Sequence, residues 1–110
     1  CVLHVDGKPA HACTLPTQAV ADAVVTTLEG LGTSGALHPL QQAFLDLNAA
    51  QCGFCTSGIV MTAAALLEHN PAPTRSDIQQ ALAGHLCRCG AHNRVIQAVL
   101  RTAVTLAAKR

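Results

Sequence analysis

Cysteine is the residue type in this chain best suited to chemistry, and four of the six cysteines form two close pairs. One pair stands in Cys52-Gly53-Phe54-Cys55 and the other in Cys87-Arg88-Cys89. Four converging thiolates bind zinc or an iron–sulfur cluster, whereas magnesium and calcium prefer oxygen ligands. The spacing does not separate these two kinds of metal site. A disulfide or a set of reduced thiols is the alternative, and a thioredoxin-like CxxC lacks its βαβ context here.

Both cysteine pairs fall in breaks between segments with helical periodicity. The segments expected to be helical span residues 39–47, 57–69, 74–82 and 93–110. Pro39 opens the first segment, Thr74 and Asp77 resemble a capping box before the third, and Gly84 is expected to end it. Short connections make successive helices antiparallel. Both cysteine pairs are therefore expected at the same end of a helical bundle.

The residues before the glycine-rich linker at 30–35 have the pattern of β-structure. Val2–Val5 and residues 8–13 are expected to form a hairpin around Asp6-Gly7, and residues 24–28 a third strand. Pro9 confines the second strand to an edge or to its first residues. Because so small a sheet is marginal alone, we expect its missing partners before residue 1, and the chain reads as truncated.

Composition excludes several classes of protein. Among the 110 residues, half are hydrophobic, two are aromatic and 12% are charged, with a net charge of +1. This balance gives no basic surface for nucleic acid or for a membrane. The longest apolar run, residues 58–67, is about half of what a membrane-spanning helix requires, and no signal peptide is visible. An aromatic-poor, aliphatic core favours closely packed helices.

Three ordered motifs carry a resemblance to a known family. They are QCGFCTSG at residues 51–58, NPAPT at 70–74 and LCRCG at 86–90. Together they resemble the small iron–sulfur subunits of molybdenum hydroxylases, the xanthine oxidase family, and are most similar to those of bacterial nicotinate, isoquinoline or aldehyde dehydrogenases. The resemblance implies an α+β, mainly α fold. It consists of a four-helix bundle carrying a 2Fe–2S cluster at 31–110, after the C-terminal remnant of a plant-type ferredoxin (β-grasp) domain at 1–30.

The resemblance also implies the site residues. Cys52, Cys55, Cys87 and Cys89 match the ligands of the 2Fe–2S cluster nearest the molybdenum centre. Gln51 and Cys89 match the positions that contact the pterin of the molybdenum cofactor. Without the resemblance, Gln51 is interpreted as a polar residue at the C-terminal end of a helix, facing water.

Cys1 and Cys13 match the last two ligands of the family's second, distal 2Fe–2S cluster. A plant-type cluster needs four cysteines, so these two form an incomplete set. Either an N-terminal segment is missing from this sequence, or the chain cannot build its second cluster. The alternative for this pair is two reduced, buried thiols in a residual hairpin.

The histidines need no metal role in this interpretation. His38 and His69 are expected at helix ends, and His4 and His11 opposite each other in the hairpin. His85 and His92 flank the second cysteine pair. Four cysteines already fill a metal site, so histidine ligation is not expected.

The function implied by the resemblance is electron transfer within an oxidoreductase complex, with no substrate-catalytic residue in this chain. The implied partners are a flavin or cytochrome c acceptor and a large molybdopterin-binding subunit. The expected compartment is the cytoplasm, or the periplasm through a partner's export signal. A structural zinc-binding helical module is the rival hypothesis, and a disulfide redox switch is a third.

Overall fold

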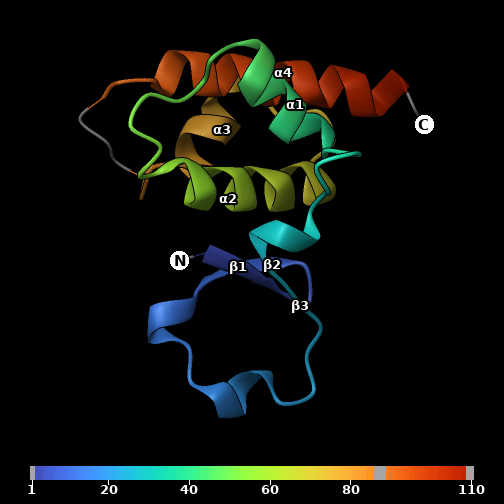
Figure 1. The fold of residues 1–110 in the computed structure, drawn as a ribbon, viewed down its shortest axis with the longest axis vertical. Helices are drawn as coiled ribbons and strands as arrows, with labels where there is room; N and C mark the ends of the chain where they lie inside the picture. Colours follow the sequence, from blue (N-terminus) through green and yellow to red (C-terminus); the bar gives the residue numbers. More distant parts are fainter. Residues whose placement is uncertain (1, 86–88, 109–110) are drawn as a thin grey trace.

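The computed structural model describes residues 2–85 and 89–108. It confirms the expected α+β class, with a three-stranded sheet and four helices (Figure 1). The strands are β1 (Val2–Val5), β2 (Lys8–His11) and β3 (Val25–Thr26). The 3-10 helices are η1 (Ala12–Thr14), η2 (Thr17–Val20) and η3 (Leu28–Gly30). The α-helices are α1 (Pro39–Asp46), α2 (Thr56–His69), α3 (Arg75–Ala81) and α4 (His92–Ala108).

The sheet is antiparallel, with β1 between β2 and β3. Asp6 and Gly7 both have positive φ, which gives the tight turn expected between β1 and β2. Pro9 lies on the edge strand β2, as its missing N–H requires. Both outer strands are shorter than expected, because η1 begins directly after β2 and η3 replaces the end of the third strand.

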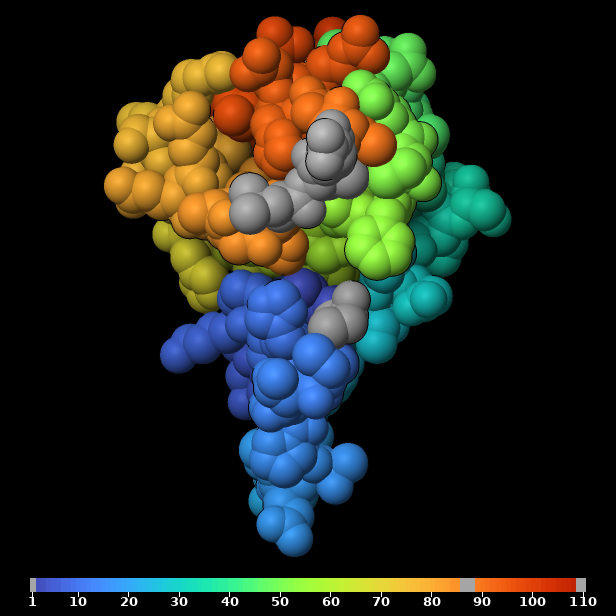
Figure 2. Space-filling model, turned by 90° about the vertical axis from the view of Figure 1, so that its left-hand side faces the viewer, coloured from blue at the N-terminus to red at the C-terminus, as the bar shows by residue number. Residues whose placement is uncertain are grey.

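Residues 12–24 project away from the helices (Figures 1 and 2). No residue of η1 or η2 is buried. The end of this projection is fastened to the hairpin turn, because Asp6 N donates to Val24 O at 2.8 Å and Val24 N donates to Asp6 Oδ1 at 2.9 Å. These two bonds place β3 beside β1.

The core lies among the helices, and α2 is its centre. Nine of the 14 residues of α2 are buried, as expected for a helix that is apolar on every side. Helix α4 instead buries one stripe, which includes Val95 and Val99. Small side chains such as Ala63 and Ala98, both fully buried, let the helices approach closely. Within residues 2–85 and 89–108, no helix has the length and apolar character needed to cross a membrane.

Local capping explains where two of the helices begin. Pro39 is the first residue of α1, as expected, and His38 with Gln41 forms a capping box there. The predicted box before α3 is also present: Asp77 N donates to Thr74 Oγ1 at 3.2 Å, and Thr74 N donates to Asp77 Oδ2 at 2.9 Å. The Thr74 backbone N–H that donates to the Asp77 carboxylate, helped by the Thr74 side chain, holds the pKa of Asp77 below its ordinary value.

A buried histidine joins the sheet to the helices. His4 in β1 is only 4% exposed, and its Nε2–H donates to the carbonyl oxygen of Met61 in α2 at 2.6 Å. The expected pairing of His4 with His11 is wrong, because the register sets His11 opposite Val2. His4 is therefore a contact between β1 and α2.

Candidate metal centre

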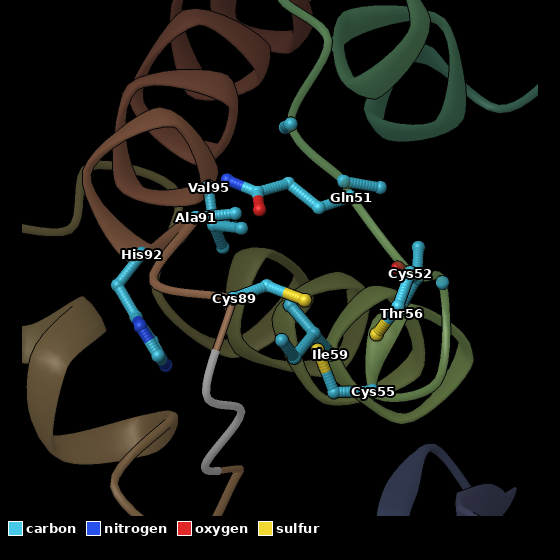
Figure 3. Close-up of a pocket in the computed structure, with 12 residues that line it drawn as sticks. Gln51, Cys52, Cys55, Thr56, Ile59, Cys89, Ala91, His92 and Val95 are labelled. Atoms are coloured by element: carbon cyan, nitrogen blue, oxygen red, sulfur yellow. The ribbon is translucent and has the colours of Figure 1, made fainter.

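Three of the four predicted ligands border one pocket. Helices α2 and α4 begin at the same end of the molecule, and the loops before them carry Cys52, Cys55 and Cys89 (Figure 1). All three line the pocket, and Figure 3 shows their sulfur atoms turned toward the same space. Cys87 lies outside the described residues, so the structure does not place the fourth thiol.

The first loop is shaped by a glycine and ends in a helix. Gly53 has a φ of 80°, which allows the chain to turn between the two cysteines. Phe54 N donates to Cys52 Sγ at 3.5 Å, a bond that favours a negatively charged sulfur. Cys55 is the N-cap of α2, so the positive end of the helix dipole lies beside its thiol.

The second loop repeats this arrangement. Cys89 is half-buried and is followed by Gly90, whose φ is 69°. Ala91 then leads into α4, and its carbonyl oxygen accepts a bond from Val95 N at 3.0 Å. Helix α4 begins at His92, one residue before the predicted start.

Gln51 borders the same pocket. Helix α1 ends at Asp46, so Gln51 lies in the following loop, and its interpretation as the end of a helix is wrong. Its side chain is exposed and extends across the pocket toward Ala91 and Val95 (Figure 3). A polar amide thus stands at the rim of the cysteine pocket.

Cys13 stands apart from this pocket. It lies in η1, on the projecting segment, and it is exposed. The interpretation of Cys13 as a buried thiol is therefore wrong. Its predicted companion, Cys1, lies outside the described residues.

The donor set fits an iron–sulfur cluster. A 2Fe–2S cluster divides four cysteines between two irons, and the sequence supplies its cysteines as two close pairs. Among the residues that the structure describes, three of these thiols border the pocket. Thiolates, an amide aimed at sulfur and the buried side chains of Ile59 and Val95 are surroundings that suit such a cluster.

The two histidines that flank the second cysteine pair contact protein groups. His92 is turned away from the sulfur atoms (Figure 3), and its Nε2–H donates to the carbonyl oxygen of His85 at 3.3 Å. The ring of His85 shares a hydrogen bond of 2.9 Å with Thr62 Oγ1. Burial, helped by the nearby His11, lowers the pKa of His85. Thr62 could not be found from the sequence, because it lies 23 residues from His85 and no local pattern marks it.

Comparisons with known proteins show the family of the chain. Residues 27–100 match the family described as the 2Fe-2S binding domain. One subunit of the nicotinate dehydrogenase of Pseudomonas putida is 48% identical over 105 residues, which cover 96% of this chain and 67% of the relative. The alpha subunit of isoquinoline 1-oxidoreductase from Brevundimonas diminuta is 45% identical over 103 residues, which cover 94% of this chain and 67% of the relative.

A solved structure matches the whole chain. Aldehyde oxidoreductase from Desulfovibrio gigas superposes with a TM-score of 0.93 at 38% identity, over 100% of this chain and 12% of that one. The chain thus spans about two thirds of the length of the two curated relatives and a small part of the aldehyde oxidoreductase. From these matches, the chain belongs to the 2Fe-2S binding domain family, in the form found in the molybdenum hydroxylase class of oxidoreductases.

Proposed function

We propose that this chain transfers electrons in a molybdenum hydroxylase complex, from the molybdenum site of a partner to an acceptor. In this proposal Cys52, Cys55, Cys87 and Cys89 hold a 2Fe–2S cluster, which supplies one-electron redox chemistry when bound. The observation that carries the proposal is the meeting of three of these thiols at one pocket, from loops far apart in the sequence.

Other residues of the chain stabilise the cysteine ligands and exclude water from the pocket. The dipole of α2 and the amide of Phe54 favour negative charge on the sulfur atoms of the first loop. Ile59 and Val95 are buried and form apolar walls. Hydrogen bonds to sulfur and exclusion of solvent are the means by which a protein sets a cluster's potential.

The partner that we propose at this end of the molecule is the large molybdopterin-binding subunit. Gln51 and Cys89 are the residues that we assign to contact the pterin, and both border the pocket. Phe54, beside the pocket, is 91% exposed, and Leu45 is 63% exposed. Large apolar side chains exposed next to a redox site support a covering partner. A flavin or cytochrome c subunit is the proposed acceptor, in the cytoplasm or, through a partner's export signal, the periplasm.

We assign residues 1–30 to the end of a ferredoxin-like domain and residues 31–110 to the four-helix, cluster-binding domain. The exposed position of Cys13 supports its role as a ligand of a second 2Fe–2S cluster with Cys1. Such a cluster needs two further cysteine ligands. The match of the 2Fe-2S binding domain family from residue 27 onward supports a boundary near residue 30.

A redox cycle tests the proposed function. The anaerobically purified protein is reduced with dithionite, freed of excess reductant and mixed with oxidised cytochrome c or a free flavin. We expect the visible absorption of the protein to bleach on reduction and to return as the acceptor is reduced. A protein without visible absorption, or one whose absorption does not respond to dithionite, would contradict the proposal.

A further inference from the structure

We infer that His85 is a positioning residue, which fixes the segment carrying Cys89 against α2 through contacts with Gly58 and Thr62. We call these residues, together with His92, the His85 clamp. The inference rests on the proposed function, because the position of this segment affects a cluster only if Cys89 is one of its ligands.

The first part of the clamp is the contact between α2 and the imidazole ring of His85. Thr62 is buried, and its Oγ1 shares a hydrogen bond of 2.9 Å with His85 Nε2. A Cβ placed on Gly58 would lie 3.2 Å from both Cε1 and Nδ1 of the ring. Gly58 and Thr62 are four residues apart and so share one face of the helix. Glycine lets the ring approach the helix, and threonine holds it there.

The second part ties the ends of the cysteine segment together. His85 N donates to the carbonyl oxygen of Leu82 at 2.9 Å, and His85 O accepts the bond from His92 Nε2–H at 3.3 Å. Cys89 lies between these two histidines in the sequence, and His92 is the first residue of α4. Because Cys55 caps α2, the clamp sets the position of the second loop relative to the first.

The sheet covers another side of the same ring. The ring centroids of His85 and His11 lie 6.2 Å apart, with a tilt of 33°. The side chain of Val2 lies 3.5 Å from a Cβ built on Gly58, so β1 also approaches this face of α2. The imidazole is thus packed between α2 and the sheet.

Three threonine substitutions test the clamp in the cluster-loaded protein. Thr62→Val keeps the shape of the side chain and removes its hydroxyl group, whereas Thr62→Ser keeps the hydroxyl. Thr102→Val is the matched control, because Thr102 is also buried in a helix but donates to Ala98 O at 2.7 Å within α4. We expect Thr62→Val to lose iron to a chelator about 10-fold faster, which is the low end of the loss in metal affinity when a ligand's own hydrogen-bond partner is removed. The reduced cluster should also show shifted EPR g values, while Thr62→Ser and Thr102→Val behave like the parent.

A second measurement separates this inference from the proposed function. Amide hydrogen exchange at His85 is followed in the same preparations, and we expect it to be faster in Thr62→Val than in Thr102→Val. If the parent holds no 2Fe–2S cluster, the proposed function fails and the exchange alone decides the inference. If Thr62→Val does not fold by circular dichroism, Gly58→Ala takes its place with the same expectation. Loss of iron from Thr62→Val at the parent's rate would overturn the inference. If the parent holds no cluster, equal exchange at His85 in Thr62→Val and Thr102→Val would overturn it.

Discussion

The three cysteines that border the pocket have different surroundings from Cys13, and we assign them a different role. Cys55 and Cys89 are half-buried, and Cys52 is exposed but receives the Phe54 amide on its sulfur atom. Cys55, the N-cap of α2, also stands where the helix dipole favours a thiolate. Cys13 is exposed on the projecting segment, away from the pocket. We therefore assign the cluster in this pocket to the four cysteines of the two close pairs, and Cys13 is not one of its ligands.

Replacement of one thiol in the pocket should remove the cluster without unfolding the chain. Cys55→Ser exchanges a soft sulfur ligand for a hard oxygen. Because Cys55 is the N-cap of α2, and serine is a favoured N-cap residue, helix content should be kept. We expect visible absorption, iron and sulfide to fall to background, while circular dichroism stays like that of the parent. Cys13→Ser is the control and should keep the pocket's cluster. A Cys55→Ser protein with its full iron and sulfide would refute this ligand.

The elements that local chemistry defines could be predicted from the sequence. Pro39 marks the start of α1, and Thr74 with Asp77 marks that of α3, because caps act within a few residues. The ends of elements were harder to predict. Helix α3 ends at Ala81 without using Gly84, and β3 has only two residues because η3 follows it so closely. Contacts such as those of His4 with Met61 join distant residues, and no local pattern contains them.

The turn inside the first cysteine loop depends on glycine. Gly53 and Gly84 are both exposed, and an added Cβ would meet nothing within 4 Å at either. Only Gly53 has a positive φ, where a side chain costs about 1–2 kcal/mol. We expect Gly53→Ala to lower the free energy of unfolding by this amount in urea titrations, and Gly84→Ala to leave it unchanged. Equal effects of the two substitutions would show that backbone strain is not the cause.

The joint between sheet and helices depends on one buried ring. His4→Ala removes the bond to Met61 O, at a cost of about 1 kcal/mol, and leaves a cavity that adds to the loss. His69→Ala is the control, because exposed His69 also links α2 to the hairpin, through Gly7 O at 3.2 Å. We expect a loss of about 0.5 kcal/mol or less for His69→Ala. Denaturant midpoints measure both, and equal losses would show that burial of His4 is not decisive.

At the scale of the whole molecule, the arrangement of the helices creates the site. Cys55 and Cys89 belong to separate loops, and they meet because α2 and α4 begin at the same end. The alternation of chain direction across short connections made this meeting predictable from the sequence. The small sheet packs beside α2 through His4 and beside His85 through His11. The exposed Phe54 marks the face that we assign to the large subunit.

The central claim is that the cysteine pocket holds a 2Fe–2S cluster. The most direct measurement is the iron, zinc and inorganic sulfide content of anaerobically purified protein, together with its EPR spectrum after dithionite reduction. We predict iron and sulfide in equal amounts, a red-brown colour and the signal of a 2Fe–2S cluster reduced by one electron. Zinc without sulfide would show a structural metal site, and cysteines paired in disulfides without metal would show a redox switch. Either result would contradict the claim.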